Sequence, residues 1–179
     1  MNINNEFIKA IKNENINAIK FFLNFKGFDP TYECNFAIRL AAFLGNNQSL
    51  ITLLNDPRID PSDVDNFAVV EAIKQENTET LRLLLEDYRI KENLNSELFF
   101  KIALENENLS IINVLINNKK INPIQNDIIY FIKTFYQSKQ DIVFTLFENK
   151  SIYNYFKNYY HDFYKNIIKL KIQNKVNEF

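Results

Sequence analysis

Glycine, proline and cysteine are scarce in this chain of 179 residues, which has two glycines, four prolines and a single cysteine. All-β folds depend on many tight turns, and tight turns depend largely on glycine and proline. The scarcity of both therefore argues against an all-β fold. Cys34 has no second cysteine to pair with, so no disulfide forms within the chain, which suits a reducing compartment.

Long apolar runs and an excess of one charge are also missing. Nowhere do 18 uncharged apolar residues follow one another, so we expect no membrane-spanning helix. The first residues contain no apolar run long enough for a signal peptide. The formal net charge of -1 argues against nucleic acid or an anionic membrane as a chain-wide electrostatic partner. We expect an intracellular location, in the cytoplasm or, for a viral source, in the host cell.

Patterns that carry chemistry are missing as well. The only histidine, His161, and the only cysteine, Cys34, cannot complete a Cys/His zinc set. Two isolated glycines cannot form a phosphate-binding loop. Residues 60–71 resemble a calcium loop in part, but Val64 stands where an oxygen ligand belongs and Asp65 where the sharp turn requires glycine. We expect no catalytic residue, cofactor, metal or small-molecule substrate; an enzyme would need a deep pocket with convergent titratable groups.

The chain does contain a repeat, because Pro30 and Pro61 lie 31 residues apart and other positions keep the same period without an insertion. Five columns of residues with this spacing stay apolar or small through five copies. We expect them to form the core. They are Ala10, Ala41, Ala72, Ala103 and Thr134; Phe7, Ile38, Val69, Phe100 and Phe131; Ile19, Leu50, Leu81, Ile112 and Val143; Phe22, Leu53, Leu84, Leu115 and Leu146; and Phe28, Ile59, Ile90, Ile121 and Ile152.

Each repeat is predicted to form a helix, a tight turn, a second helix and an extended connector. In the second copy an apolar face over residues 36–41 has helical spacing, and Gly45 with Asn46 then ends one helix and caps the next. The connector "NDPRIDP" (55–61) places the apolar Ile59 between polar flanks and ends in a proline that cannot continue a helix. A helical pair this short cannot bury its own apolar face, whereas stacked pairs can.

The stretch "FAIRLAAFLGNNQSLITLLNDPRIDP" (36–61) resembles an ankyrin repeat, and the resemblance extends over about residues 5 to 154. It implies an all-α, ankyrin-like solenoid of about five repeats, with another αα solenoid as the alternative. The expected repeats are 5–30, 31–61, 62–92, 93–123 and 124–154, followed by a C-terminal capping helix or tail, 155–179.

One departure from the ankyrin pattern concerns the turn between the two helices. Four copies replace the usual glycine, with Glu14, Glu76, Glu107 and Ser138. Because a residue other than glycine costs free energy in the left-handed conformation, we expect these turns to differ from the one at Gly45.

Both ends of the expected stack carry polar residues. The first copy presents Lys9, Lys12, Asn13, Lys20 and Asn24 among its apolar positions, as a terminal repeat requires. Near the C-terminus an apolar stripe faces a basic row. The stripe contains Phe156, Tyr160, Phe163, Ile167 and Leu170, and the row contains Lys157, His161, Lys165 and Lys169. This pattern predicts an amphipathic capping helix; the alternative is a basic arm that contacts nucleic acid or a membrane.

The resemblance implies a non-enzymatic module that binds a protein partner on the concave face of the stack. The candidate partner-binding residues are Arg39, Phe43, Leu44, Lys74, Gln75, Glu105, Asn106 and Tyr136. If Phe43 and Leu44 are exposed, they provide the apolar anchor of an interface; the alternative is that they pack under a neighbouring connector as core. A second functional hypothesis is a structural spacer, which predicts an evenly polar surface.

Overall fold

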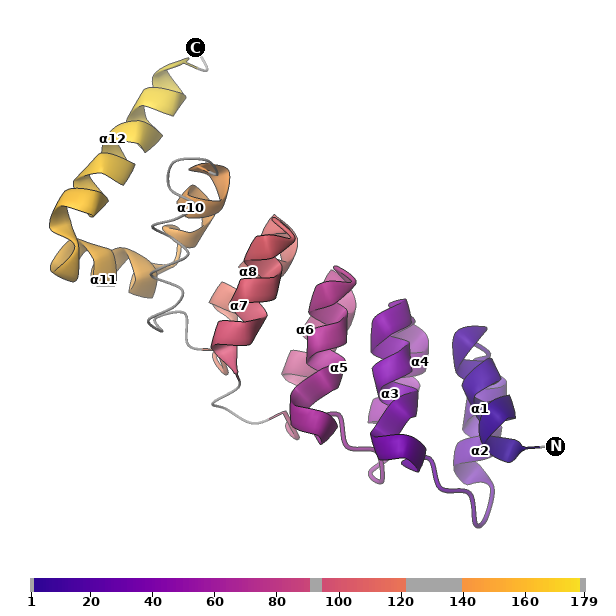
Figure 1. The fold of residues 1–179 in the computed structure, drawn as a ribbon. Coiled ribbons are helices and arrows are strands. Elements are labelled where there is room, and N and C mark those ends of the chain that lie inside the picture. Colours follow the sequence, from indigo (N-terminus) through magenta and orange to yellow (C-terminus); the bar gives the residue numbers. More distant parts are fainter. Residues whose placement is uncertain (1, 91–94, 122–139, 178–179) are drawn as a thin grey trace. The chain divides into compact units, whose positions relative to one another are not determined.

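The computed structural model describes residues 2–90, 95–121 and 140–177, and every regular element in these ranges is an α-helix (Figure 1). The prediction of an all-α protein is therefore confirmed. The chain divides into two compact units, Met1–Leu94 and Asn95–Phe179. This division falls just inside the expected fourth repeat.

The helices of the first unit are α1 (Ile3–Lys12), α2 (Ile16–Asn24), α3 (Tyr32–Leu44), α4 (Asn47–Leu54), α5 (Asp63–Lys74) and α6 (Thr78–Glu86). Those of the second unit are α7 (Ser96–Glu105), α8 (Leu109–Asn117), α10 (Gln140–Leu146), α11 (Lys150–Tyr159) and α12 (His161–Asn177). No helix within the described ranges has the length and apolar character needed to cross a membrane.

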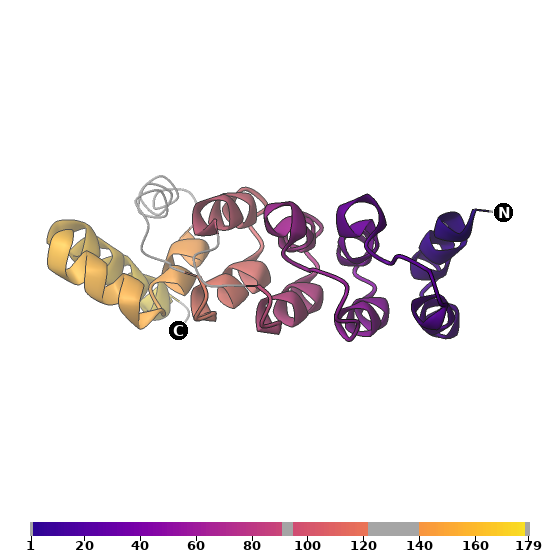
Figure 2. The ribbon, with the colours of Figure 1, turned by 90° about the horizontal axis from the view of Figure 1, so that it is seen from below.

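The first unit is built from three helical pairs. Within each pair one helix packs on the next, α1 on α2, α3 on α4 and α5 on α6. Between pairs, α3 lies beside both α1 and α5, and α4 lies beside both α2 and α6, so the helices form two layers (Figure 2). The three pairs therefore follow one another in space in the order of the sequence.

The residues that repeat every 31 positions form the core. Almost every described member of the five columns is buried, with Phe22 as the half-buried exception. The connector residue Ile59 is 1% exposed, as expected for an apolar residue turned inward between polar flanks. Phe131 and Thr134 lie outside the described residues. The prediction of the core from the period is confirmed at the described positions.

The four turns that join paired helices share one conformation, so the expectation that the glutamate turns differ is wrong at Glu14, Glu76 and Glu107. These residues have φ of 50°, 59° and 55°, and Gly45 has φ of 69°. Ser138 lies outside the described residues. In every case the next residue is an asparagine whose N–H donates to an alanine carbonyl five positions back, as Asn46 does to Ala41 (3.1 Å). These helix-ending hydrogen bonds offset the cost of about 1–2 kcal/mol that a left-handed residue other than glycine carries.

The asparagines of these turns also connect neighbouring pairs. Asn46 Nδ2 donates to the carbonyl of Ile11 at 2.8 Å, and Asn77 Nδ2 donates to that of Ala42 at 2.9 Å. The last carbonyls of a helix have no partner within it. Each asparagine therefore satisfies a helix end of the preceding pair.

The connectors contribute a second set of bonds between pairs, through Arg58 and Arg89. Arg58 Nη2 donates to the carbonyl of Leu23 at 2.7 Å, and Arg89 Nη2 donates to that of Leu54 at the same distance. Each guanidinium also bonds the aspartate two residues earlier, Asp56 or Asp87. The hydrogen bond from Arg58 lowers the pKa of Asp56.

The second unit is less regular. Packing contacts join α7 to α8, α8 to α10, and α11 to α12. Two helices, α11 and α12, stand where one capping helix was expected, and α11 begins before the expected boundary at residue 155. The backbone breaks at Tyr160, which has φ of -134° and ψ of 53°. Phe156 and Ile167 of the expected stripe are buried, and the basic row at 157, 161, 165 and 169 is exposed.

Candidate binding edge of the first unit

The candidate site lies where the first helices of the three pairs end. Because α3 packs beside both α1 and α5, their C-terminal ends form one edge, which we call the first-helix edge. Its residues are Lys12 and Asn13, Phe43 and Leu44, and Lys74 and Gln75, and all of them are exposed. Phe43 and Leu44, which we call the Phe43–Leu44 step, are thus the apolar residues of this edge, and the residues at the ends of both neighbouring helices are polar.

The side chains of Phe43 and Leu44 are solvent-accessible, with relative exposures of 44% and 39%. They do not pack under a neighbouring connector as core residues. Both follow the buried pair Ala41–Ala42 and are the last residues of α3 before its left-handed turn. The side chains therefore lie on the surface because the helix ends there, directly after its buried segment.

The backbone that carries this apolar step is held firmly. Asn77 Nδ2 donates to the carbonyls of Ala42 and Phe43, at 2.9 and 3.1 Å. A Cβ atom on Gly45 would lie 2.7 Å from Asn77 Oδ1, so a side chain at this position would displace the asparagine. Glycine thus serves a close approach here as well as the positive φ, and the end of α3 is fixed before any partner binds.

Arg39, one helical turn before Phe43, is occupied by contacts within the fold. Its Nη2 and Nε donate to the carbonyls of Glu33 (2.7 Å) and Cys34 (3.1 Å). These residues belong to a left-handed first turn of α3, with φ of 52° and 55°. The guanidinium also lies over the rings of Phe36 and Phe67, 5.5 and 5.8 Å from their centroids. We therefore assign Arg39 a structural role in joining α3 to α5.

Lys74 lies on the α5 side of the edge and has contacts of its own. Its Nζ lies 3.6 Å from Glu71 Oε1 and 5.4 Å from the ring centroid of Phe67. The lysine remains 45% exposed, so its charge is still accessible to a partner. With Gln75 next to it, the α5 end of the edge is polar and carries one cation.

The remaining predicted residues do not join this edge in the described structure. Glu105 and Asn106 are exposed at the end of α7, in the second unit. Tyr136 lies outside the described residues. The structure therefore brings together Phe43, Leu44, Lys74 and Gln75, while Arg39 has a structural role within α3 and towards Phe67.

Metal-binding and nucleophilic groups do not converge in the described part of the chain, where no cluster of three His, Cys, Asp or Glu residues could hold a metal ion. Cys34 is exposed in the first turn of α3. The ring of His161 is exposed and stacks on that of Tyr164, with 6.4 Å between their centroids.

Two groups of residues were not anticipated from the sequence. The connector arginines Arg58 and Arg89 share the 31-residue period and the pattern Asp-x-Arg, a signal that could have predicted their common role. Phe21 of α2 and Phe25, which directly follows α2, are exposed, although the first repeat was expected to be polar on its outer side. The residue equivalent to Phe21 in the second repeat is Thr52. This change from threonine to phenylalanine indicates that the environment of this position differs in the first repeat.

A scan of protein-family models, a search of curated proteins and a search of solved structures each found no match to the chain.

Proposed function

We propose that the chain is a non-enzymatic protein-interaction module of ankyrin-like helical pairs, and that a protein partner binds at the first-helix edge. The observation that carries this proposal is the exposed Phe43–Leu44 step at a fixed helix end. The pairing of α1 to α6 at a 31-residue period supports the ankyrin-like part of the proposal.

The physical case for binding rests on exposed apolar area and on rigidity. Full burial of a phenylalanine or leucine side chain contributes about 1.5–3 kcal/mol, and a few such anchors carry most of the free energy of an interface. Because Asn77 already holds the end of α3, binding costs little ordering of the backbone. The complementary surface is an apolar pocket whose rim has polar or acidic groups near Lys12 and Lys74.

The two alternatives have less support. A structural spacer predicts an evenly polar surface, and the exposed Phe43 and Leu44 interrupt such a surface. The basic row of the C-terminal segment is exposed, and it is the surface that the alternative of a nucleic-acid or membrane contact would use. In that segment Lys171 lies 3.7 Å from Glu148, so part of the positive charge there has a carboxylate neighbour.

The test is capture of partners by the intact chain, followed by mass spectrometry, with the double variant Phe43→Ala/Leu44→Ala beside it. We expect the double variant to lose the captured partner and to keep its melting temperature. The matched control is Tyr88→Ala, because Tyr88 is 82% exposed in the same unit but lies away from the edge.

Two outcomes contradict the proposal. In the first, the double variant captures the same partner as the parent chain. In the second, its melting temperature falls strongly, which would place the two side chains in the core.

A further inference from the structure

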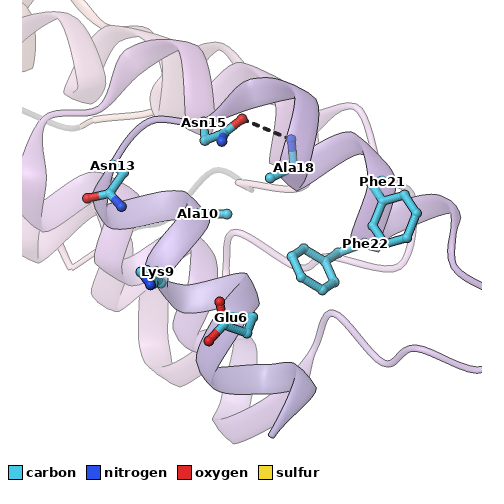
Figure 3. A pocket seen from close by; sticks show the side chains of 8 residues that line it. All are labelled: Glu6, Lys9, Ala10, Asn13, Asn15, Ala18, Phe21 and Phe22. Atoms are coloured by element: carbon cyan, nitrogen blue, oxygen red, sulfur yellow. Dashed lines mark hydrogen bonds between the residues drawn. The ribbon is translucent and has the colours of Figure 1, made fainter. Parts of the chain in front are cut away.

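The outer side of the first helical pair has an open cavity of about 370 Å³. We call this side the N-terminal face. Residues of α1, of α2 and of the turn between them line the cavity (Figure 3): Glu6, Lys9, Ala10, Asn13, Asn15, Ala18, Phe21 and Phe22.

In the later pairs, the side equivalent to the N-terminal face packs against another helical pair. Thr80 in α6 occupies the place in its repeat that Ala18 occupies in α2. It is buried, and its hydroxyl donates to Asn47 of the preceding pair at 2.6 Å. Likewise Thr52, the counterpart of Phe21, is 8% exposed. The equivalent side of α3–α4 and α5–α6 is thus covered by another pair of helices.

On the N-terminal face the corresponding position holds a large aromatic residue. Phe21 is 64% exposed, and its ring centroid lies 5.7 Å from that of Phe22 and 6.2 Å from that of Phe25. Among the polar residues that line the cavity, Lys9, Asn13 and Asn15 are exposed. Lys20 and Asn24, which were also expected to be polar positions of this end, line a groove shared with α4 instead. An exposed aromatic cluster with a polar rim is the composition of an interaction surface.

The charges on this face indicate what could bind to it. Glu6 and Lys9 stand three residues apart on α1, and neither forms an ion pair within the described part of the chain. Between them in the sequence is Phe7, whose ring centroid lies 5.8 Å from that of Phe22. The aromatic cluster of α2 is therefore level with the midpoint between the two charges.

This arrangement is self-complementary. A two-fold axis that crosses α1 between Glu6 and Lys9 places each of these residues opposite the other type in a second copy. The same axis passes by Phe22, so the aromatic clusters of the two copies meet at the centre. Two ion pairs then flank an apolar centre, which is the pattern of an isologous interface.

We propose that a second copy of this chain binds the N-terminal face and forms a two-fold symmetric dimer. In this dimer α1 runs antiparallel to α1 of the other copy, and α2 antiparallel to the other α2. One face of two short helices gives a small interface, below about 1,200 Å² in total. The dimer is therefore weak and depends on concentration. It shares Asn13 with the first-helix edge but does not involve Phe43 or Leu44, so it is tested separately from the proposed function.

The first test is sedimentation velocity of the full chain over a range of concentrations. We expect the dimer fraction to rise with concentration, and Phe21→Asp to raise the dissociation constant at least about ten-fold, as loss of a central anchor does. The matched control is Phe43→Ala/Leu44→Ala, which changes two exposed apolar residues of the same unit and leaves dimerisation unchanged. Circular dichroism melting of each variant checks that it remains folded.

The second test is a charge swap. Glu6→Lys alone places like charges opposite each other twice, so it weakens the dimer, and Lys9→Glu alone does the same. The double variant Glu6→Lys/Lys9→Glu restores the pairs in reverse and recovers the dimer. The proposal is overturned by a monomer at all concentrations, by longer head-to-tail polymers, by a dimer insensitive to Phe21→Asp, or by a folded double swap that stays monomeric.

Discussion

The backbone carbonyl at one position of the repeat accepts a hydrogen bond in both units, but the side chain that donates this bond differs between them. Leu23 and Leu54 in the first unit and Ile116 in the second occupy one column of the repeat, near the end of the second helix. In the first unit the donors to these carbonyls are Arg58 and Arg89. In the second unit the donor is Asn149, whose Nδ2 lies 2.7 Å from the carbonyl oxygen of Ile116.

This difference shows which property of the connector the fold requires. A helix end leaves carbonyls without internal partners, and a buried one must find a donor elsewhere. An arginine held by a neighbouring aspartate meets that need, and so does an asparagine at the start of the next helix. Asn149 performs two roles, because its Oδ1 also accepts from the N–H groups of Ser151 and Ile152 and so caps α11. The connector sequence can therefore vary between repeats, provided that it supplies a side-chain hydrogen-bond donor to the helix-end carbonyl of the earlier repeat.

The largest expected effect comes from removing the more buried arginine. The Arg89 side chain is 14% exposed and donates to the carbonyls of Leu54 and Ile59 as well as to Asp87. We expect Arg89→Ala to lower the free energy of unfolding by about 3 kcal/mol. Asp87 loses the guanidinium and keeps the backbone N–H of residue 89, while the carbonyls of Leu54, Asp56 and Ile59 lose their side-chain donor. Urea denaturation measures the loss.

Arg89→Lys is the matched control for this variant. It keeps the charge but cannot bond the carboxylate and both carbonyls together, so its loss should be smaller yet clear. An equal stability of Arg89→Ala and the parent chain would contradict the role assigned to the arginine.

A smaller effect is expected at the corresponding position of the second unit. Asn149→Ala removes both the cap of α11 and the bond to Ile116, so we expect a loss of about 1.5 kcal/mol. Asn149→Ser separates the two roles, because serine can cap the helix but is too short to reach Ile116. Hydrogen exchange of α8 and α11 distinguishes them. The serine variant should speed exchange at the end of α8 and spare α11, and protection unchanged in both helices for Asn149→Ala would disprove the assignment.

The smallest effect is expected at Arg58, which is 42% exposed and pairs with Asp56. We expect Arg58→Ala to cost about 1 kcal/mol at neutral pH. The hydrogen bond from Arg58 lowers the pKa of Asp56 in the folded chain. The carboxylate therefore adds stability above its unfolded pKa of about 3.9, and that stability is lost as the pH falls through the folded-state pKa.

The difference between Arg58→Ala and the parent chain should therefore narrow in acid. Thermal unfolding of both proteins from pH 7 to pH 3 measures it. A difference that stays constant over this range would show that the ion pair adds nothing.

The sequence predicted the buried columns well because a period without insertions places equivalent residues in equivalent environments. Ala41, Ala72 and Ala103 are fully buried for this reason. Other features did not follow from the repeat pattern. The left-handed Glu76 contradicts a local preference for glycine, and the backbone bonds of its turn offset the cost. The break between α11 and α12 has no glycine or proline to mark it.

The candidate site was predictable in location but not in the role of each residue. The repeat pattern placed Phe43 and Leu44 at the candidate binding positions that follow Ala41 and Ala42. The pattern did not decide their exposure, because an apolar residue in the last turn of a helix can face the core or the solvent. Arg39 was expected to contact a partner, whereas the carbonyls that it binds belong to a left-handed turn that no sequence rule indicated. Arginine has five N–H donors, and in Arg39 some of these donors already bond backbone carbonyls within the fold.

The side-chain bonds that reach the helix-end carbonyls of an earlier pair have the same direction along the chain, whereas Asn35 Nδ2 of α3 donates forward to the carboxylate of Asp63. The side-chain donor follows its carbonyl acceptor by 35 residues at Asn46, Asn77, Arg58 and Arg89, and by 33 at Asn149. During synthesis the pairs α1–α2 and α3–α4 therefore leave the ribosome before the side chains that bond their helix-end carbonyls, which the pair made next supplies. We therefore expect these pairs to assemble in the order of their synthesis.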